Sequence, residues 1–364
     1  MTDALRVLIL SASIGEGHDL PARVIADGLR QERPGVHVRI EDGLLAMGWP
    51  IDRAVLGGAR MESRAGELFF DALYWVYAQV KPTRRLGGWL LETLGGKRLL
   101  ALIAEECPDI VVATYPGVSE ALGRLRQHGR LDVPVASAIT DLAGLYYWAH
   151  PGVDLHLVIH RESIEEVRAI APASRIVWAN GMWSPDFLVP RDRADARRAL
   201  DLPPDGPVIV VSGGGWAMGD LAGAAEAALR VDGATVVCLC GRMEEVRASL
   251  AARFAGESRL RALGFTDVMG DWLAAGDALI HSTVGLTVLE AIIRGCPVIS
   301  YGWGRGHIRA NNHAYRRFGL AEVATTRAEL DAALRRALAH RPEPDLSLTQ
   351  IPSAASEILA QARR

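Results

Sequence analysis

The chain has 364 residues, more than one hydrophobic core usually supports, so two domains are expected. Apolar residues make up 49% of it and the formal net charge is −3, which argues against general nucleic-acid binding. No apolar run reaches the roughly 18 residues of a membrane span, and no basic signal-peptide segment precedes the first strand.

The four cysteines, Cys107, Cys238, Cys240 and Cys296, lie in apolar surroundings without the paired spacing of a zinc site. We therefore expect reduced, buried thiols in a cytosolic protein, with no bound metal.

The first half alternates short apolar strands with helical patterns. A strand at 7–10 leads into the loop Ser11–His18, and a helix capped by Asp19 follows as far as Arg30. Further strands are expected at 36–40, 110–113, 135–139 and 155–159.

The same pattern starts again after Pro190. A helix is expected at 192–200, followed by strands at 208–211, 235–240 and 278–280, with helices at 220–230 and 287–294. Alternating strands and helices indicate parallel sheets, so we predict an α/β fold of two doubly wound, Rossmann-like domains facing a central cleft. The predicted domains are 1–188, to which a final helix at 350–364 returns, and 189–349, with a hinge near 184–193.

Gly213, Gly214 and Gly215 follow the strand 208–211 and precede a helix. Backbone N–H groups can approach a pyrophosphate closely where side chains are absent, so phosphate binding is favoured over a flexible turn.

The segment 277–303 combines a strand, the polar loop His281–Gly285, a helix and a second strand. Its helix start can receive phosphate, and the Glu290 carboxylate can accept both hydroxyls of a ribose. The alternative is a capping box, in which Glu290 only closes the helix start with Thr287.

His18 ends the first glycine-containing loop, beside a helix start whose dipole favours a neutral imidazole that can accept a proton. Asp141 follows the strand 135–139 and could orient such a base, bind a hydroxyl or cap the next element. Gly15-x-Gly17 also matches part of a dinucleotide fingerprint, but Leu20 replaces its third glycine.

Residues 67–91 place aromatic side chains among basic ones, which suits either an interfacial membrane patch or a core helix with a solvated turn. The candidate acceptor or membrane residues are Gly17, Phe69, Phe70, Trp75, Trp89, Arg84 and Arg85, together with Lys81.

Several of these motifs together resemble the monogalactosyldiacylglycerol synthase family. They are 9–18 (ILSASIGEGH), Thr140-Asp141, 181–187 (GMWSPDF), 213–216 (GGGW), 240–242 (CGR), 264–269 (GFTDVM) and 282–297, in family order and over nearly the whole chain. The family consists of inverting GT-B glycosyltransferases related to the enzyme that forms lipid II. The resemblance implies an N-terminal acceptor domain, a C-terminal UDP-sugar domain and no essential metal or other cofactor.

The resemblance also implies residue roles. His18 would be the general base, and Arg242 and Phe265 would frame the uracil. Glu290 would bind ribose. The diphosphate would be held by Gly213, Gly214, Gly215 and Trp216 and by 283–287, including Thr283, Gly285, Leu286 and Thr287, with Ser282 as a further donor-binding residue.

The sugar-binding motif departs from the family pattern. Where the family commonly has Gly-Gln-Glu before an Asn, this chain has Gly306-His307-Ile308 before Asn311. His307 can engage hydroxyls and Ile308 cannot, so the donor sugar need not be galactose.

The sequence thus predicts hexose transfer from a UDP-sugar to a lipid hydroxyl, with diacylglycerol as the expected acceptor. The predicted partners are the UDP-sugar, the lipid and an anionic membrane surface, at the cytoplasmic face of the plasma membrane and without nucleic acid. Two alternatives stay open: a same-fold enzyme acting on a soluble or natural-product acceptor, and a non-catalytic nucleotide or lipid sensor.

Overall fold

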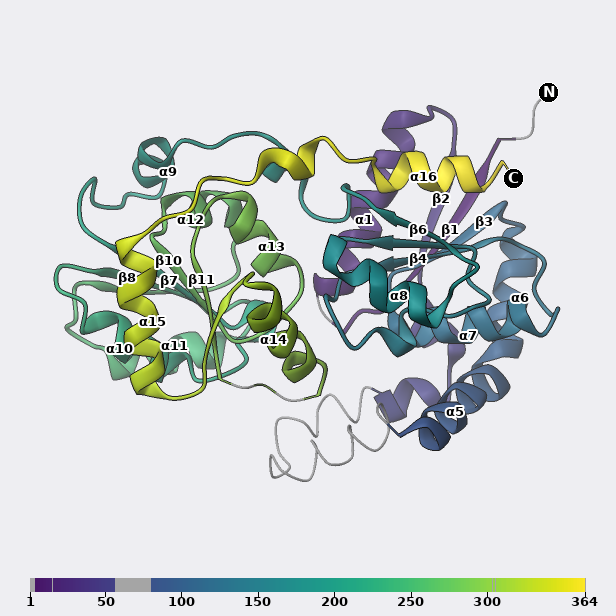
Figure 1. Ribbon diagram of the computed structural model, residues 1–364, viewed down its shortest axis with the longest axis horizontal. Helices are drawn as coiled ribbons and strands as arrows, with labels where there is room; N and C mark the ends of the chain where they lie inside the picture. The colour runs from purple at the N-terminus through teal and green to yellow at the C-terminus, as the bar shows by residue number, and fades with distance from the viewer. Residues whose placement is uncertain (1–3, 15, 56–79, 303, 305, 364) are drawn as a thin grey trace. The chain divides into compact units, whose positions relative to one another are not determined.

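The computed structural model describes residues 4–14, 16–55, 80–302, 304 and 306–363. The chain divides into two compact units, residues 1–184 with 351–364 and residues 185–350 (Figure 1). Each unit contains one six-stranded parallel sheet, and the predicted α/β class is confirmed. Among the described residues, no helix combines the length and the apolar character that crossing a membrane requires.

The first unit has the strand order β2-β1-β3-β4-β5-β6. The strands are β1 (Arg6–Ser11), β2 (His37–Asp42), β3 (Ile110–Ala113), β4 (Val135–Ile139), β5 (Leu155–Val158) and β6 (Arg175–Trp178). Strands β3, β4 and β5 are fully buried, as expected for apolar runs covered on both faces. The edge strand β2 instead carries the exposed Arg39 and the half-buried Glu41 and Asp42, and such charges protect a sheet edge from pairing with another chain.

Helices cover this sheet on both sides. They are α1 (Glu16–Glu32), α2 (Gly43–Met47), α5 (Lys81–Leu90), the π-helical turn η1 (Leu91–Gly95), α6 (Gly96–Glu106), α7 (Pro116–Gln127), α8 (Ile164–Ile170) and α16 (Ala354–Gln361). Short turns η2 (Leu145–Tyr147) and η3 (Arg161–Ser163) follow β4 and β5.

Helix α1 starts earlier than the sequence suggested. It begins at Glu16, so Gly17 and His18 lie in its first turn and Asp19 is not its cap. The Asp19 carboxylate instead accepts a hydrogen bond from Ser11 Oγ (2.5 Å) at the end of β1.

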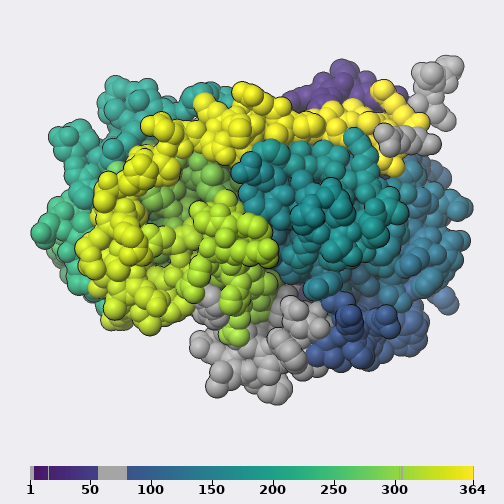
Figure 2. Space-filling view, in the orientation of Figure 1, coloured from purple at the N-terminus to yellow at the C-terminus, as the bar shows by residue number. Residues whose placement is uncertain are grey.

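The last helix returns to the first unit. Helix α16 packs on α1, where a Cβ at Gly28 would lie 3.2 Å from Ala355 Cβ. Glu357 pairs with Arg175, and Ser353 binds Glu32. The end of the chain (yellow) is visible on the surface of this unit (Figure 2).

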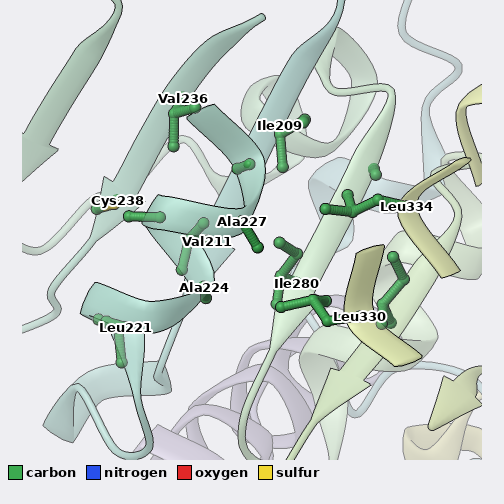
Figure 3. Packing of buried hydrophobic residues seen from close by; sticks show 14 of the residues in the cluster. Ile209, Val211, Leu221, Ala224, Ala227, Val236, Cys238, Ile280, Leu330 and Leu334 are labelled. Carbon is green, nitrogen blue, oxygen red and sulfur yellow. The ribbon is translucent and has the colours of Figure 1, made fainter. Parts of the chain in front are cut away.

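The second unit has the strand order β12-β11-β10-β7-β8-β9. Its strands are β7 (Val208–Ser212), β8 (Thr235–Leu239), β9 (Leu260–Leu263), β10 (Ala278–His281), β11 (Val298–Tyr301) and β12 (Glu322–Ala324). Its helices are α9 (Arg193–Ala199), α10 (Leu221–Leu229), α11 (Glu244–Arg253), α12 (Met269–Ala275), α13 (Leu286–Ile293), α14 (His307–Phe318) and α15 (Arg327–Ala339). The 3₁₀ turns are η4 (Pro185–Leu188), η5 (Gly214–Trp216) and η6 (Leu346–Thr349). Figure 3 shows β7, β8 and β10 packing against α10 and α15 through buried aliphatic side chains.

The cysteine prediction is wrong at one position. Cys238, Cys240 and Cys296 are buried thiols, but Cys107 is exposed at the left-handed end of α6 (φ 44°).

Candidate active site

Three neighbouring strands of the first unit end at the same edge of its sheet. Because β1, β3 and β4 are parallel neighbours, the residues after their carboxyl ends gather there. His18 follows β1, Thr114 and Tyr115 follow β3, and Thr140 and Asp141 follow β4. Such an edge is where open parallel sheets bind ligands.

His18 is half-buried and held on several sides. Its Nδ1 lies 3.0 Å from the Thr114 carbonyl oxygen, which can only accept, so Nδ1 carries a proton. The neutral ring therefore has its lone pair on Nε2, the form a general base needs. The Tyr115 ring meets the imidazole edge-on at 5.1 Å between centroids, and the Trp148 ring is tilted against it at 5.8 Å.

Asp141 is connected to His18 through Trp148. The carboxylate of Asp141 accepts a hydrogen bond from the Trp148 indole Nε1 (2.8 Å), and it is the Trp148 ring that packs against His18. The sequence alone did not indicate Trp148 or Thr114. Gly17 lies one residue before His18, and its carbonyl accepts a weak bond from the Thr140 hydroxyl (3.4 Å).

In the second unit, the glycines after β7 are required by close backbone contacts. A Cβ at Gly213 would lie 2.5 Å from Met218 N, and Gly214 has a φ of 68°. A Cβ at Gly241, after β8, would lie 2.5 Å from the Gly215 carbonyl oxygen. Trp216, at the end of this turn, is 57% exposed. The turn is therefore tightly packed at Gly213 and Gly241, whereas a Cβ at Gly215 would meet nothing within 4 Å.

The loop after β10 contacts this glycine turn. A Cβ at Gly214 would lie 3.2 Å from Thr283 Oγ1. Buried His281 donates from Nδ1 to the Ser212 carbonyl (3.1 Å), so its Nε2 accepts the Thr283 hydroxyl proton (2.6 Å). Burial lowers the pKa of His281 to about 4, which keeps the ring neutral in this role. His281, which the sequence did not single out as a site residue, thus joins the two loops.

Helix α13 begins directly after that loop, at Leu286, with Gly285 as its cap (φ 91°). The amide of Gly285 donates to the Tyr315 hydroxyl (3.4 Å), and the Leu286 side chain is buried, so only its backbone can face a ligand. Ser282 N donates to the Ser212 carbonyl (3.2 Å), and Thr287 is half-buried in the first turn.

The capping-box alternative for Glu290 is wrong. The helix starts at Leu286 and Gly285 caps it, so Thr287 is already inside it and cannot pair with Glu290 as a cap. Glu290 is buried, and burial raises the pKa of its carboxyl to about 7, although Arg294 one turn later lowers it. Glu290 therefore lies inside the helix as a buried carboxyl and not at its cap.

Two further predicted donor residues lie together. The Arg242 guanidinium stacks over the half-exposed Phe265 ring at 4.3 Å, and its amide donates to the Gly215 carbonyl (2.9 Å). His307 is the exposed first residue of α14, whereas Ile308 is buried against Gly304. Ile308 therefore points inward and not toward a ligand's hydroxyls.

The predicted membrane segment is only partly described. Phe69, Phe70 and Trp75 lie outside the described residues. Trp89 is 50% exposed and Arg85 is exposed on α5, as a surface contact requires.

Arg84 differs from the prediction. Its guanidinium lies 3.8 Å from the centroid of the Tyr146 ring, on the turn after β4, and not on the open face of α5. The Arg84 guanidinium therefore makes a cation–π contact within the first unit.

Comparisons with known structures define the fold. The chain is similar to Acinetobacter baumannii MurG (TM-score 0.61, 16% identity, 99% of each chain covered) and to the spinosyn rhamnosyltransferase SpnG (TM-score 0.63, 14% identity, 99% of this chain and 100% of the other). With its two doubly wound sheets, the chain has the GT-B fold. Its sequence relatives identify it as an enzyme of the glycosyltransferase class.

Sequence comparisons define the relatives. Residues 18–176 match the family of monogalactosyldiacylglycerol (MGDG) synthase. A processive diacylglycerol beta-glucosyltransferase of Staphylococcus epidermidis is 24% identical over 332 residues, covering 90% of this chain and 83% of the relative. The resemblance to MGDG synthase-like GT-B glycosyltransferases that the motifs indicate is confirmed.

Proposed function

We propose that this enzyme transfers a hexose from a UDP-sugar to a lipid hydroxyl, with diacylglycerol as acceptor and inversion at the sugar C1. The observation that carries the proposal is the fixed imidazole of His18, whose Nδ1–H on the Thr114 carbonyl leaves Nε2 to take the acceptor proton. One direct displacement by the acceptor oxygen inverts C1. The names of the relatives support a lipid acceptor.

The second unit supplies the donor site in this proposal. The glycine turn 213–215 and the start of α13 offer backbone N–H groups to the diphosphate, and Glu290 accepts the ribose hydroxyls. The helix dipole then steadies the leaving UDP without a metal ion. Arg242 and Phe265 border the uracil, and His307 contacts the hexose.

The test is incubation with a panel of UDP-sugars and a total lipid extract, read by mass spectrometry. We expect a hexosylated diacylglycerol whose anomeric configuration, determined by NMR, is opposite to that of the donor. A product formed only from soluble acceptors, or UDP-sugar binding without turnover, would overturn the lipid transferase in favour of one of the alternatives.

Helix α5 and the turn η1 provide the membrane contact in this proposal. Leu86, Trp89, Leu90 and Leu94 are exposed in successive turns, with Lys81, Arg85 and Lys97 exposed among them. This blue segment lies at the surface of the first unit (Figure 2). Apolar side chains flanked by cations fit an anionic lipid surface, which supports a peripheral position at the cytoplasmic face of the plasma membrane in this proposal.

Replacing Lys81 and Arg85 by serine should weaken co-sedimentation with anionic vesicles by about 1 kcal/mol for each charge. A matched control replaces Arg23 and Arg30, which are about half-exposed on α1 of the same unit. The control should bind vesicles nearly as the unchanged protein does. Equal losses in both variants, or binding insensitive to salt, would contradict docking through α5.

A further inference from the structure

The turn between β4 and Ala149 packs against His18 and has no role in the chemistry proposed above. Trp148 is 2% exposed. Its indole N–H is held by Asp141 and its carbonyl by Ser137 Oγ (2.9 Å), while its ring packs on the imidazole. The indole cannot shift without breaking these bonds, so it forms a fixed wall for His18.

The start of the same turn is fixed from helix α8. The Glu166 carboxylate accepts hydrogen bonds from the amides of Gly144 (3.1 Å) and Leu145 (2.8 Å). Gly144 is left-handed here (φ 77°), which suits a glycine. Hydrogen bonds therefore hold both ends of the turn 144–148 in place.

Tyr146, in the middle of this turn, carries the Arg84 guanidinium on its ring. Arg84 belongs to α5, the helix that exposes Trp89 and Leu86. One short turn therefore contacts His18 through Trp148 and the proposed membrane helix through Tyr146.

We infer that the turn 144–148 positions His18 and that the Arg84–Tyr146 stack holds this turn from α5, so that losing the stack lowers turnover. The inference rests on the proposed function, which supplies the roles of His18 and α5. Trp148, Tyr146 and Arg84 are positioning residues in it, since they act through the imidazole. Small misplacements of a base can cost large factors in rate, so such a link should be visible in kcat.

Arg84→Met and Arg85→Met form a matched pair. Each removes one positive charge from α5 and substitutes the same side chain, but only Arg84 stacks on Tyr146. Burial raises the pKa of the Glu120 carboxyl to about 7 and the Arg84 charge lowers it, so variants at Tyr146 test the stack without this charge effect. On saturating anionic phosphatidylglycerol-containing vesicles, we expect kcat to fall about tenfold in Arg84→Met and less than twofold in Arg85→Met. The KM for UDP-sugar should stay the same in both, because the proposed donor residues lie on the other unit.

Changes to the partner ring separate positioning from general damage. Tyr146→Phe keeps the ring face and should retain kcat, whereas Tyr146→Leu should behave like Arg84→Met. The double variant Arg84→Met/Tyr146→Leu should be no slower than either single one, since both remove one contact. The NMR signals of the His18 ring should move in Arg84→Met and not in Arg85→Met, a readout that requires no turnover.

The failures are distinguishable. A wild-type chain that transfers no hexose to any lipid would overturn the proposed function. If the wild type is active but Arg84→Met and Arg85→Met have the same kcat and the same His18 signals, only the inferred positioning of His18 through Arg84 and Tyr146 would be overturned.

Discussion

Replacing His18 by alanine should lower kcat by about 10²–10⁴-fold, the usual contribution of a general base. The Thr114 carbonyl fixes the proton on Nδ1, so the neutral ring presents Nε2 as the proton acceptor. UDP-sugar affinity should change little, because the proposed donor residues belong to the other unit. Steady-state kinetics combined with calorimetric UDP binding would separate the two effects.

His18→Gln is the matched control, since it keeps a polar side chain but has no basic nitrogen. It should be as slow as His18→Ala, and added imidazole should partly restore the alanine variant. Near-normal turnover in both variants would assign the base to Asp141 or another group.

Much of the fold could be predicted because its strands are short, continuous apolar runs. The expected strands at 110–113 and 135–139 match β3 and β4. The start of α1 could not be predicted, because Glu16-Gly17 is typical of a loop and Asp19 is typical of a helix cap. The Ser11 hydroxyl, which comes from the preceding strand, binds that carboxylate instead. The tertiary hydrogen bond to Ser11 therefore outweighs the local preference of Asp19 for a helix cap.

The positions of site loops follow from the sequence, whereas the partners of their side chains do not. Glycines directly after the strand at 208–211 predicted the turn at β7. His18, however, is held by Thr114, 96 residues away, through a carbonyl that any residue would supply. The partner of Arg84 could not be predicted either. The basic and aromatic residues of α5 indicated a membrane contact, whereas Tyr146, on which Arg84 stacks, comes next to it only in the folded chain.

Replacing Glu290 by glutamine should weaken UDP binding and at the same time stabilise the protein. In the proposal the charged carboxylate accepts two ribose hydroxyls, and losing charged hydrogen bonds costs about 1–3 kcal/mol. Burial raises the pKa of this carboxyl from 4.5 to about 7, so the folded state resists its ionisation. Stability is therefore lost as pH rises from the unfolded pKa through the folded one, and the glutamine variant avoids that loss.

At pH 8 we expect the melting temperature of Glu290→Gln to rise by several degrees, while calorimetry shows UDP affinity reduced about fivefold or more. Glu343→Gln, an exposed carboxyl on the same unit, should change neither quantity.

The pH dependence of binding provides the sharpest check. Ribose hydroxyls favour the ionised carboxylate, so UDP-sugar affinity should rise from pH 6 to 8 in the wild type, with proton release, and stay flat in Glu290→Gln. UDP-sugar suits this series because its diphosphate is esterified at both ends and keeps no proton to lose near neutrality. A glutamine variant that gains stability and binds UDP-sugar as tightly as the wild type at every pH would show that Glu290 is a buried acid without a ligand.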